Sequence, residues 1–186
     1  MRPRVHAVVA SIVLLLALGT ITPADAQERI GIGIGVRSSL ISDVQNLLTP
    51  TVYVPIVVSD RFTVEPEVGI VRVSEEEGDV DETVTFLTVG AGLLFGIGDL
   101  GDDQIYIGPR VGLLRTSFSE EVDGGEFSDS NTNMFLAGVL GGEFFLQPSF
   151  SLGGEAGLRY LDTGSDGSDG SLFATTAEFR VRWYFD

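Results

Sequence analysis

The chain has 186 residues, with 11 basic against 27 acidic side chains and a formal net charge of −16. Every basic residue is arginine, cysteine is absent, and the only histidine is His6. This composition argues against nucleic-acid binding and against adhesion to anionic lipid through a basic patch, and it is not that of a disulfide-stapled scaffold.

The N-terminus has the pattern of a secretory signal peptide. Two arginines precede an apolar run, Ala7–Leu18, and Ala24 and Ala26 follow in an A-x-A arrangement. The apolar run is too short for a spanning helix; an N-terminal membrane anchor is the alternative. We expect residues 1–26 to be the signal peptide, cleaved after Ala26, and residues 27–186 to form one domain.

Strand-like segments fill the rest of the chain, each bounded by turn-forming or acidic residues. We interpret Ser39–Pro50, the single helical candidate, as a loop. The eight predicted strands are approximately Ile30–Ser38, Thr51–Val58, Phe62–Val73, Val84–Ile97, Gln104–Phe118, Thr132–Leu146, Ser149–Leu161 and Leu172–Phe185.

The connections between these strands alternate between short and long. Gln147–Pro148 is a tight turn, whereas the acidic stretches Glu75–Glu82 and Asp162–Ser171 read as solvated loops. This alternation is typical of outer-membrane barrels with short periplasmic turns and longer external loops. The sequence therefore predicts an all-β fold, an eight-stranded antiparallel up-and-down transmembrane β-barrel.

Most predicted strands have one apolar and one polar face, although alternation alone does not tell a membrane barrel from a soluble barrel or sandwich. The polar face is rich in glycine and free of lysine, which suits a narrow lumen. Strand six is weaker, because Val139 shares a side with Glu143. Arg72 and Arg115 fall on the apolar side, near external strand ends where snorkelling is tolerable.

Acidic and basic residues balance on the polar face, as charges inside a closed lumen require. We predict that five glutamates and five arginines form a lumen ion network: Arg37, Glu65, Glu67, Arg110, Glu143, Glu155, Arg159, Glu178, Arg180 and Arg182.

Aromatic residues on the apolar face gather near the predicted periplasmic ends, as in an interfacial girdle. They are Phe62, Phe95, Phe144, Phe150, Trp183 and Phe185.

In these features the chain resembles bacterial outer-membrane β-barrel proteins of the eight-stranded, OmpA-like transmembrane-domain type. The most specific piece is "FRVRWYF", Phe179–Phe185, which is similar to the terminal strand signal read by the barrel-insertion machinery. Its apolar positions are Phe179, Val181, Trp183 and Phe185. Asp186 departs from the pattern, because the family usually ends on the aromatic residue.

Catalysis has little support in the sequence. The resemblance implies that enzymes among outer-membrane barrels use a histidine, and the predicted mature chain has neither histidine nor cysteine for that role or for a zinc site. Glu65 and Glu67 could be an acid/base pair, but ion pairing with lumen arginines fits them better. Glu75–Glu82 and Asp162–Ser171 could offer oxygen ligands to Ca²⁺, but their acidic residues do not have the spacing of an EF-hand loop. We expect no enzyme, cofactor or metal site.

Three functional hypotheses remain. The first is a structural or surface-interaction protein of the cell outer membrane, plugged by the ion network and carrying acidic external loops. Its partners would be outer-membrane lipid and lipopolysaccharide, divalent cations at the loops, and the barrel-assembly machinery during insertion. The alternatives are a narrow pore or transporter for small, including hydrophobic, molecules, and a soluble secreted lipid-binding barrel.

Overall fold

The computed structural model describes residues 29–39, 48–77, 80–100, 103–122, 125–163 and 170–185, so the predicted signal peptide and Asp186 lie outside the described residues. Strands make up nearly all of this part. They are β1 (Arg29–Ser39), β2 (Thr49–Tyr53), β3 (Ile56–Ser59), β4 (Phe62–Glu77), β5 (Val80–Leu100), β6 (Asp103–Val122), β7 (Gly125–Gln147), β8 (Phe150–Asp162) and β9 (Ser171–Phe185). Among those residues there is no helix with the length and apolar character of a membrane-spanning segment.

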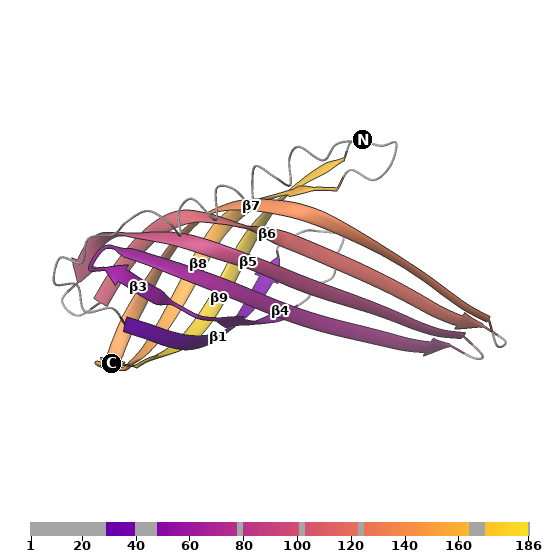
Figure 1. The fold of residues 1–186 in the computed structure, drawn as a ribbon, viewed down its shortest axis with the longest axis horizontal. Coiled ribbons are helices and arrows are strands. Elements are labelled where there is room, and N and C mark those ends of the chain that lie inside the picture. Colours follow the sequence, from indigo (N-terminus) through magenta and orange to yellow (C-terminus); the bar gives the residue numbers. More distant parts are fainter. Residues whose placement is uncertain are drawn as a thin grey trace.

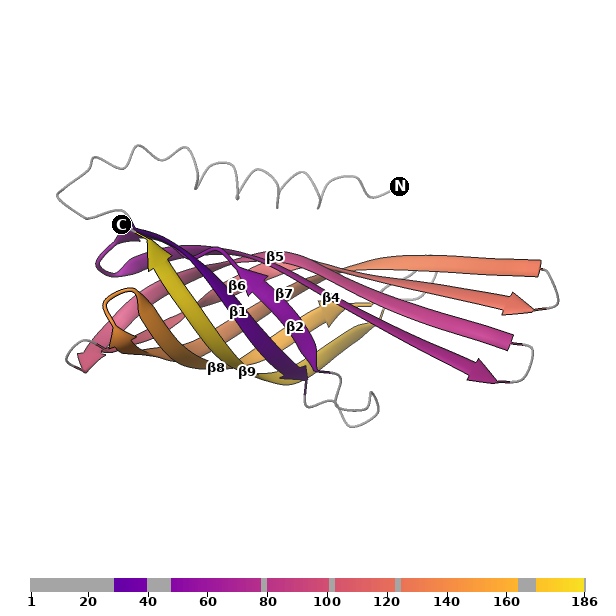
Figure 2. The same cartoon turned by 90° about the horizontal axis from the view of Figure 1, so that it is seen from below.

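The strands close into an antiparallel barrel (Figures 1 and 2). β1 pairs with β2 and β3 on one side and with β9 on the other, from Ile30 opposite Phe185 to Ser39 opposite Thr176. Closure leaves neither the first nor the last strand with a free edge, which a bilayer requires because lipid cannot hydrogen-bond the backbone. The predicted all-β, eight-stranded up-and-down barrel is confirmed, with β2 and β3 together forming its second strand.

The second barrel strand is broken where one continuous strand was predicted. The break falls at Val54 and Pro55, between β2 and β3. Proline has no N–H to give to the ladder. The Pro55 carbonyl still accepts a 2.8 Å hydrogen bond from the Gly31 amide, and the Val54 amide donates to the Pro66 carbonyl at 3.0 Å. The wall therefore stays hydrogen-bonded across the break.

The outer face of the barrel is apolar and exposed. Ile32, Ile34, Val68, Leu140 and Phe179 are each at least 45% exposed, although they are among the most hydrophobic residues of the chain. A soluble barrel would bury such side chains. The soluble lipid-binding alternative is therefore wrong, because this barrel has its apolar side chains outside and its charges inside.

Aromatic side chains gather on the outer face near the short turns, where the girdle was predicted. Phe62 packs on Phe95 with ring centroids 5.0 Å apart, and Phe150 packs on Trp183 at 4.8 Å. The C-terminal end of β9 lies at this end of the barrel (Figure 2). These pairs lie at the end of the barrel that was predicted to be periplasmic, where such barrels carry an aromatic girdle.

The inner face of β7 is apolar as well as charged, which explains its ambiguous pattern. Val139 and Ala137 are buried in a small cluster with Leu94 and Tyr106. Glu143 lies further along the same face and is also buried. One side of the lumen is thus filled by small and aromatic side chains rather than by charges.

Strands β4 to β7 run well beyond the rest of the barrel as a protruding four-stranded sheet (Figures 1 and 2). They have 16 to 23 residues, against 13 in β8. The prediction of a loop at residues 75–82 is wrong, and residues 119–131, between two predicted strands, also belong to strands: most of these residues pair in register, from Glu75 opposite Glu82 to Ser119 opposite Ser128. The hairpins continue because every added residue of one strand finds a partner on the next.

Candidate functional site

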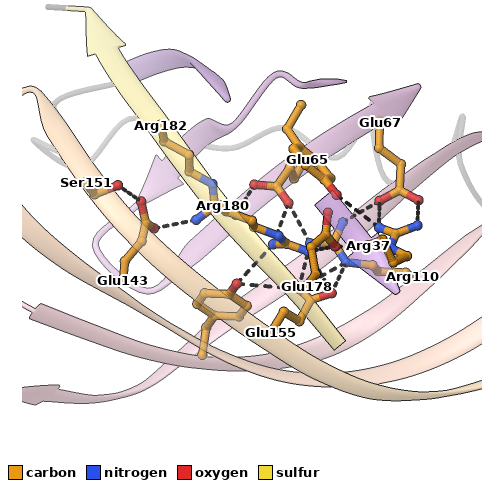
Figure 3. A network of polar contacts seen from close by, with 12 residues as sticks. Arg37, Glu65, Glu67, Arg110, Glu143, Ser151, Glu155, Glu178, Arg180 and Arg182 are labelled. Carbon is orange, nitrogen blue, oxygen red and sulfur yellow. Dashed lines mark hydrogen bonds and ion pairs between the residues drawn. The ribbon is translucent and has the colours of Figure 1, made fainter. Parts of the chain in front are cut away.

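The barrel lumen holds a dense cluster of opposite charges, drawn in Figure 3. All ten residues of the predicted lumen network lie on the inner face, and nine of them form ion pairs. They come from six strands, β1, β4, β6, β7, β8 and β9. The nine are all buried, with at most 8% of each residue exposed.

Arg110 on β6 lies at the centre of the network. Its Nη2 is 2.5 Å from Glu65 Oε1 and its Nη1 is 2.9 Å from Glu67 Oε2, so it joins two neighbouring inward residues of β4. On the other side, its Nε and Nη2 donate to the two carboxylate oxygens of Glu155 on β8, at 2.9 and 2.8 Å. One guanidinium therefore connects opposite walls of the barrel.

The last strand contributes the next two arginines. Arg180 contacts Glu65 at 3.2 Å, Glu155 at 2.7 Å and Glu178 at 2.9 Å. Arg182 pairs with Glu65 and also contacts Glu143 at 2.6 Å. Glu65 thereby receives three guanidinium groups and has no measurable exposure. The two arginines of β9 are therefore bound by carboxylates from β4, β7 and β8 and from β9 itself.

Arg37 closes the network at the β1 wall. It binds Glu67 through both terminal nitrogens, at 3.1 and 2.9 Å, and its Nε donates to Glu178 Oε2 at 3.1 Å. A planar guanidinium matched to two carboxylate oxygens is the strongest common form of ion pair. Since Arg37 and Glu178 face each other across the β1–β9 seam, this contact joins the first and last strands.

Three tyrosines and a serine complete the network, and they were not among the predicted site residues. Tyr184 and Ser151 donate to Glu143 Oε1 at 2.7 and 2.5 Å. Tyr106 accepts a hydrogen bond from Arg180 at 3.0 Å, and Tyr53 accepts one from Arg37 at 3.2 Å. For Tyr106, Ser151 and Tyr184, the parity that they share with predicted lumen residues on the same strands was the signal that could have identified them; Tyr53 lies on β2, where no lumen residue was predicted.

Arg159 is the one predicted network residue without an ion pair among the described residues. Its guanidinium lies over the Phe135 ring, 4.3 Å from the centroid. Its Nε is buried without a hydrogen-bond partner in that part of the chain. Arg159 thus lies beside the network without a direct contact to its carboxylates, and it adds one positive charge to the lumen.

Glycines leave room for these long side chains in a narrow lumen. A Cβ at Gly92 would lie 2.7 Å from Arg110 Nη1, and a Cβ at Gly35 would lie 2.7 Å from Glu178 Oε1. These two glycines therefore allow Arg110 and Glu178 to lie close against the barrel wall.

The arrangement suits structure better than catalysis. Glu65 and Glu67 share Arg110 and are each bound by at least one further arginine, and every carboxylate of the network has a cationic partner. Within the described residues, no group of three or more potential metal ligands is present. The predicted acidic candidates for Ca²⁺ are only partly within that range: Glu75–Glu77 lie on β4, and residues 164–169 lie outside it.

The terminal strand residues Phe179, Val181, Trp183 and Phe185 all lie on the outer face of β9. β9 pairs with β8 through Phe150 to Asp162 and with β1 through Ile30 to Ser39. Its apolar side chains therefore face away from the lumen while its charges bind inside.

Comparison with known proteins agrees with this geometry. The family model described as an outer membrane protein beta-barrel domain matches residues 11–185. Among curated proteins, none matches the chain by sequence.

Three solved structures have a similar fold. Ail, the attachment invasion locus protein of Yersinia pestis, was solved in complex with the heparin analogue sucrose octasulfate; it has a TM-score of 0.56 and 18% identity, over 85% of this chain and 97% of that one. Neisserial surface protein A has a TM-score of 0.56 and 16% identity, over 85% and 97%. A major outer membrane protein of Thermus thermophilus has a TM-score of 0.60 and 11% identity, over 85% and 99%. At these identities the likeness concerns the fold.

Proposed function

The chain belongs to the outer-membrane β-barrel protein family and is a protein of the bacterial outer membrane, and from this premise we propose that it is a plugged, non-enzymatic barrel with a structural or surface-interaction role. The barrel anchors and orients the protruding sheet outside the cell. The lumen network closes the barrel, so that solutes do not pass through it.

The observation that carries this proposal is the burial of the lumen network. Nine charged side chains cross-link six strands around Arg110, with no more than 8% of any residue exposed. A hydrated pore would leave such groups in water, whereas eight-stranded barrels are narrow enough for side chains to fill. Because each carboxylate is held by arginines on other strands, opening a path would require several ion pairs to break together. This opposes the narrow-pore alternative.

The protruding sheet supports the surface role. It carries carboxylates on both faces, among them Glu75, Glu76, Glu82 and Asp81, and all four are exposed. Ail was solved with a polysulfated sugar. A sheet with this charge would repel such a ligand, so we infer that the partners of this chain differ in charge from that molecule.

The remaining parts of the proposal follow from the same placement. Outer-membrane lipid covers the apolar face, and divalent cations bridge the acidic hairpins to anionic lipopolysaccharide. The barrel-assembly machinery reads the outward apolar side of β9. Residues 1–26 act as a signal peptide cleaved after Ala26, which leaves residues 27–186 as the barrel domain.

Site-specific labelling tests the proposed orientation. Because the chain has no cysteine, an introduced cysteine is the only thiol that a maleimide can label. Ser74→Cys places a thiol on the protruding sheet, and Ser149→Cys places one in the turn between β7 and β8; both serines are exposed. On intact cells, a membrane-impermeant maleimide should label the first variant and not the second. Labelling of Ser149→Cys alone would place the hairpins in the periplasm and contradict the proposal.

A further inference from the structure

The protruding sheet inverts the polarity of the barrel wall. Registers between β4 and β7 run without a shift from the lumen into the sheet, from Glu67 opposite Gly90 to Glu75 opposite Glu82. Each face of the sheet is therefore a direct continuation of a face of the barrel. The outer face is apolar in the barrel, and the inner face is the one that carries the lumen network.

Above the barrel this distribution reverses. The outer face becomes polar: beyond Ile70 its cross-strand rows consist of Arg72, Thr85, Ser117 and Ser130, and then Ser74, Thr83, Ser119 and Ser128. The inner face becomes apolar on β4 and β5 and at Phe118 of β6, and it is polar at Asn131 and Asp129 of β7. Its successive rows are Val71, Phe86, Thr116 and Asn131, and then Val73, Val84, Phe118 and Asp129.

A row of carboxylates borders this apolar patch at its far end. Glu75, Glu82 and Glu120 lie opposite one another on three neighbouring strands, and Phe127 ends the row on β7. Like charges directly opposite one another destabilise a sheet. Phe127 is 62% exposed and Val73 is 42% exposed. The inner face thus combines exposed apolar side chains with carboxylates that form no ion pair among the described residues.

A sheet with one apolar face ordinarily buries that face under a second layer. We propose that the inner face of the protruding sheet, defined as Val71, Val73, Val84, Phe86, Phe118, Glu75, Glu82 and Glu120, docks a cationic amphipathic segment of an external polypeptide. The proposal rests on the surface role proposed above and names the partner class for it.

The dimensions and charge of the patch specify that partner. The patch residues lie on three adjacent strands, β4, β5 and β6, which span about 10 Å across the sheet, and the rows from Val71 to Glu75 span about 13 Å along it. This area matches one amphipathic helix, whose diameter is about 10 Å and whose apolar stripe lies between polar flanks. Lysine or arginine flanking that stripe would meet Glu75, Glu82 and Glu120, whereas an acidic helix or a sulfated sugar would be repelled.

Peptide binding to the full-length protein tests this proposal. The protein is placed in phosphatidylcholine nanodiscs, and the probe is a fluorescent 14-residue synthetic peptide with a leucine stripe flanked by arginines. Fluorescence anisotropy should show binding above that of empty nanodiscs. The same peptide with glutamate in place of each arginine should not bind.

Paired variants separate the inner face from general acidity. Glu75→Gln with Glu82→Gln removes two inner charges and should weaken binding at least threefold. Glu76→Gln with Asp81→Asn removes two charges at the same height on the outer face and should change binding less than 1.5-fold. Val84→Ser with Phe118→Ser should weaken it at least tenfold, and since these residues lie outside the membrane-spanning wall, the barrel still assembles.

Equal losses from the inner and outer charge pairs, or no binding above empty nanodiscs, would overturn the docking surface. Neither result touches the proposed function, which fails only if the Ser149→Cys labelling is external or the wild-type barrel conducts. The two failures are therefore distinguishable.

Discussion

Glu65 is the residue whose charge the lumen network needs most. Its carboxylate has no measurable exposure and accepts contacts from Arg110 at 2.5 Å, from Arg180 at 3.2 Å and from Arg182. Glu65→Gln keeps the size of the side chain but removes the charge, and it turns one acceptor into an amide donor facing guanidinium groups. Breaking a buried ion pair in this way costs about 3–5 kcal/mol, or two to almost four powers of ten in the folding equilibrium.

Denaturant unfolding from lipid vesicles measures this loss. Trp183 is the only tryptophan of the chain, and it lies 44% exposed on the outer face, where its emission reports departure from the bilayer. The matched control is Glu76→Gln, the same chemical change at an exposed position of β4, which should stay within about 0.5 kcal/mol of wild type. A loss below about 1 kcal/mol for Glu65→Gln would refute the reasoning, because it would mean that water already screens the lumen charges.

Three further changes give distinct expectations. Gly108→Ala should abolish the heat-modifiable, compact form on electrophoresis, because a Cβ there collides with the Leu93 carbonyl oxygen, whereas Gly138→Ala should not, because nothing lies within 4 Å of its Cβ; equal behaviour of the two variants would contradict the close approach of β6 to β5 at Gly108. Arg159→Met should lower the unfolding free energy by only about 0.5–2 kcal/mol, since this residue has a ring contact and no ion pair among the described residues; a loss as large as that of Glu65→Gln would assign it to the network core. Phe185→Ala should reduce the assembled fraction in the membrane, while Phe173→Ala, on the same face at the other end of β9 and 75% exposed, should assemble normally; the reverse order would count against a terminal recognition signal.

The period-two pattern predicted the strands, and the alternation of short and long connections predicted the barrel. Ile30, Ile32 and Ile34 lie on one face and Gly31, Gly33 and Gly35 on the other, but this alternation alone fits a soluble barrel as well. The balanced charges and the lysine-free, glycine-rich composition of the polar face predicted that the charged side chains point into the lumen. The alternation did not predict which carboxylate pairs with which arginine. Pairing of Glu65 with Arg180 joins residues 115 positions apart, and that depends on the stagger of the strands around the barrel, which alternation does not encode.

The sequence-based prediction missed the protruding sheet because it gave the acidic composition of residues 75–82 more weight than the period-two pattern around them. Glutamate and aspartate are poor strand formers, so residues 75–82 read as a loop. The alternation of Val71 and Val73 before that stretch, and of Val84 and Phe86 after it, indicated that the strands continue. In the structure the hairpin continues through the acidic residues because the backbone of each one pairs with a residue of the neighbouring strand.

Arg159 and the break at Pro55 show two other limits of the sequence. Charge counting assigned Arg159 to the network, yet Phe135, from the neighbouring strand, holds its guanidinium instead. Pro55 was placed inside a continuous strand, although a proline in a ladder predicts an interruption. The ring contact of Arg159 and the hydrogen bonds around Pro55 both depend on the neighbouring strand, and the sequence does not give the register between neighbouring strands.

Single-channel recording in planar bilayers tests the central claim, that the lumen network closes the barrel, most directly. Purified wild-type protein, inserted and verified by its heat-modifiable migration, should raise no stable conductance above the bare bilayer. Reproducible, stable channels from the pure protein would contradict the account, because they would require a water-filled path through the ion pairs around Arg110.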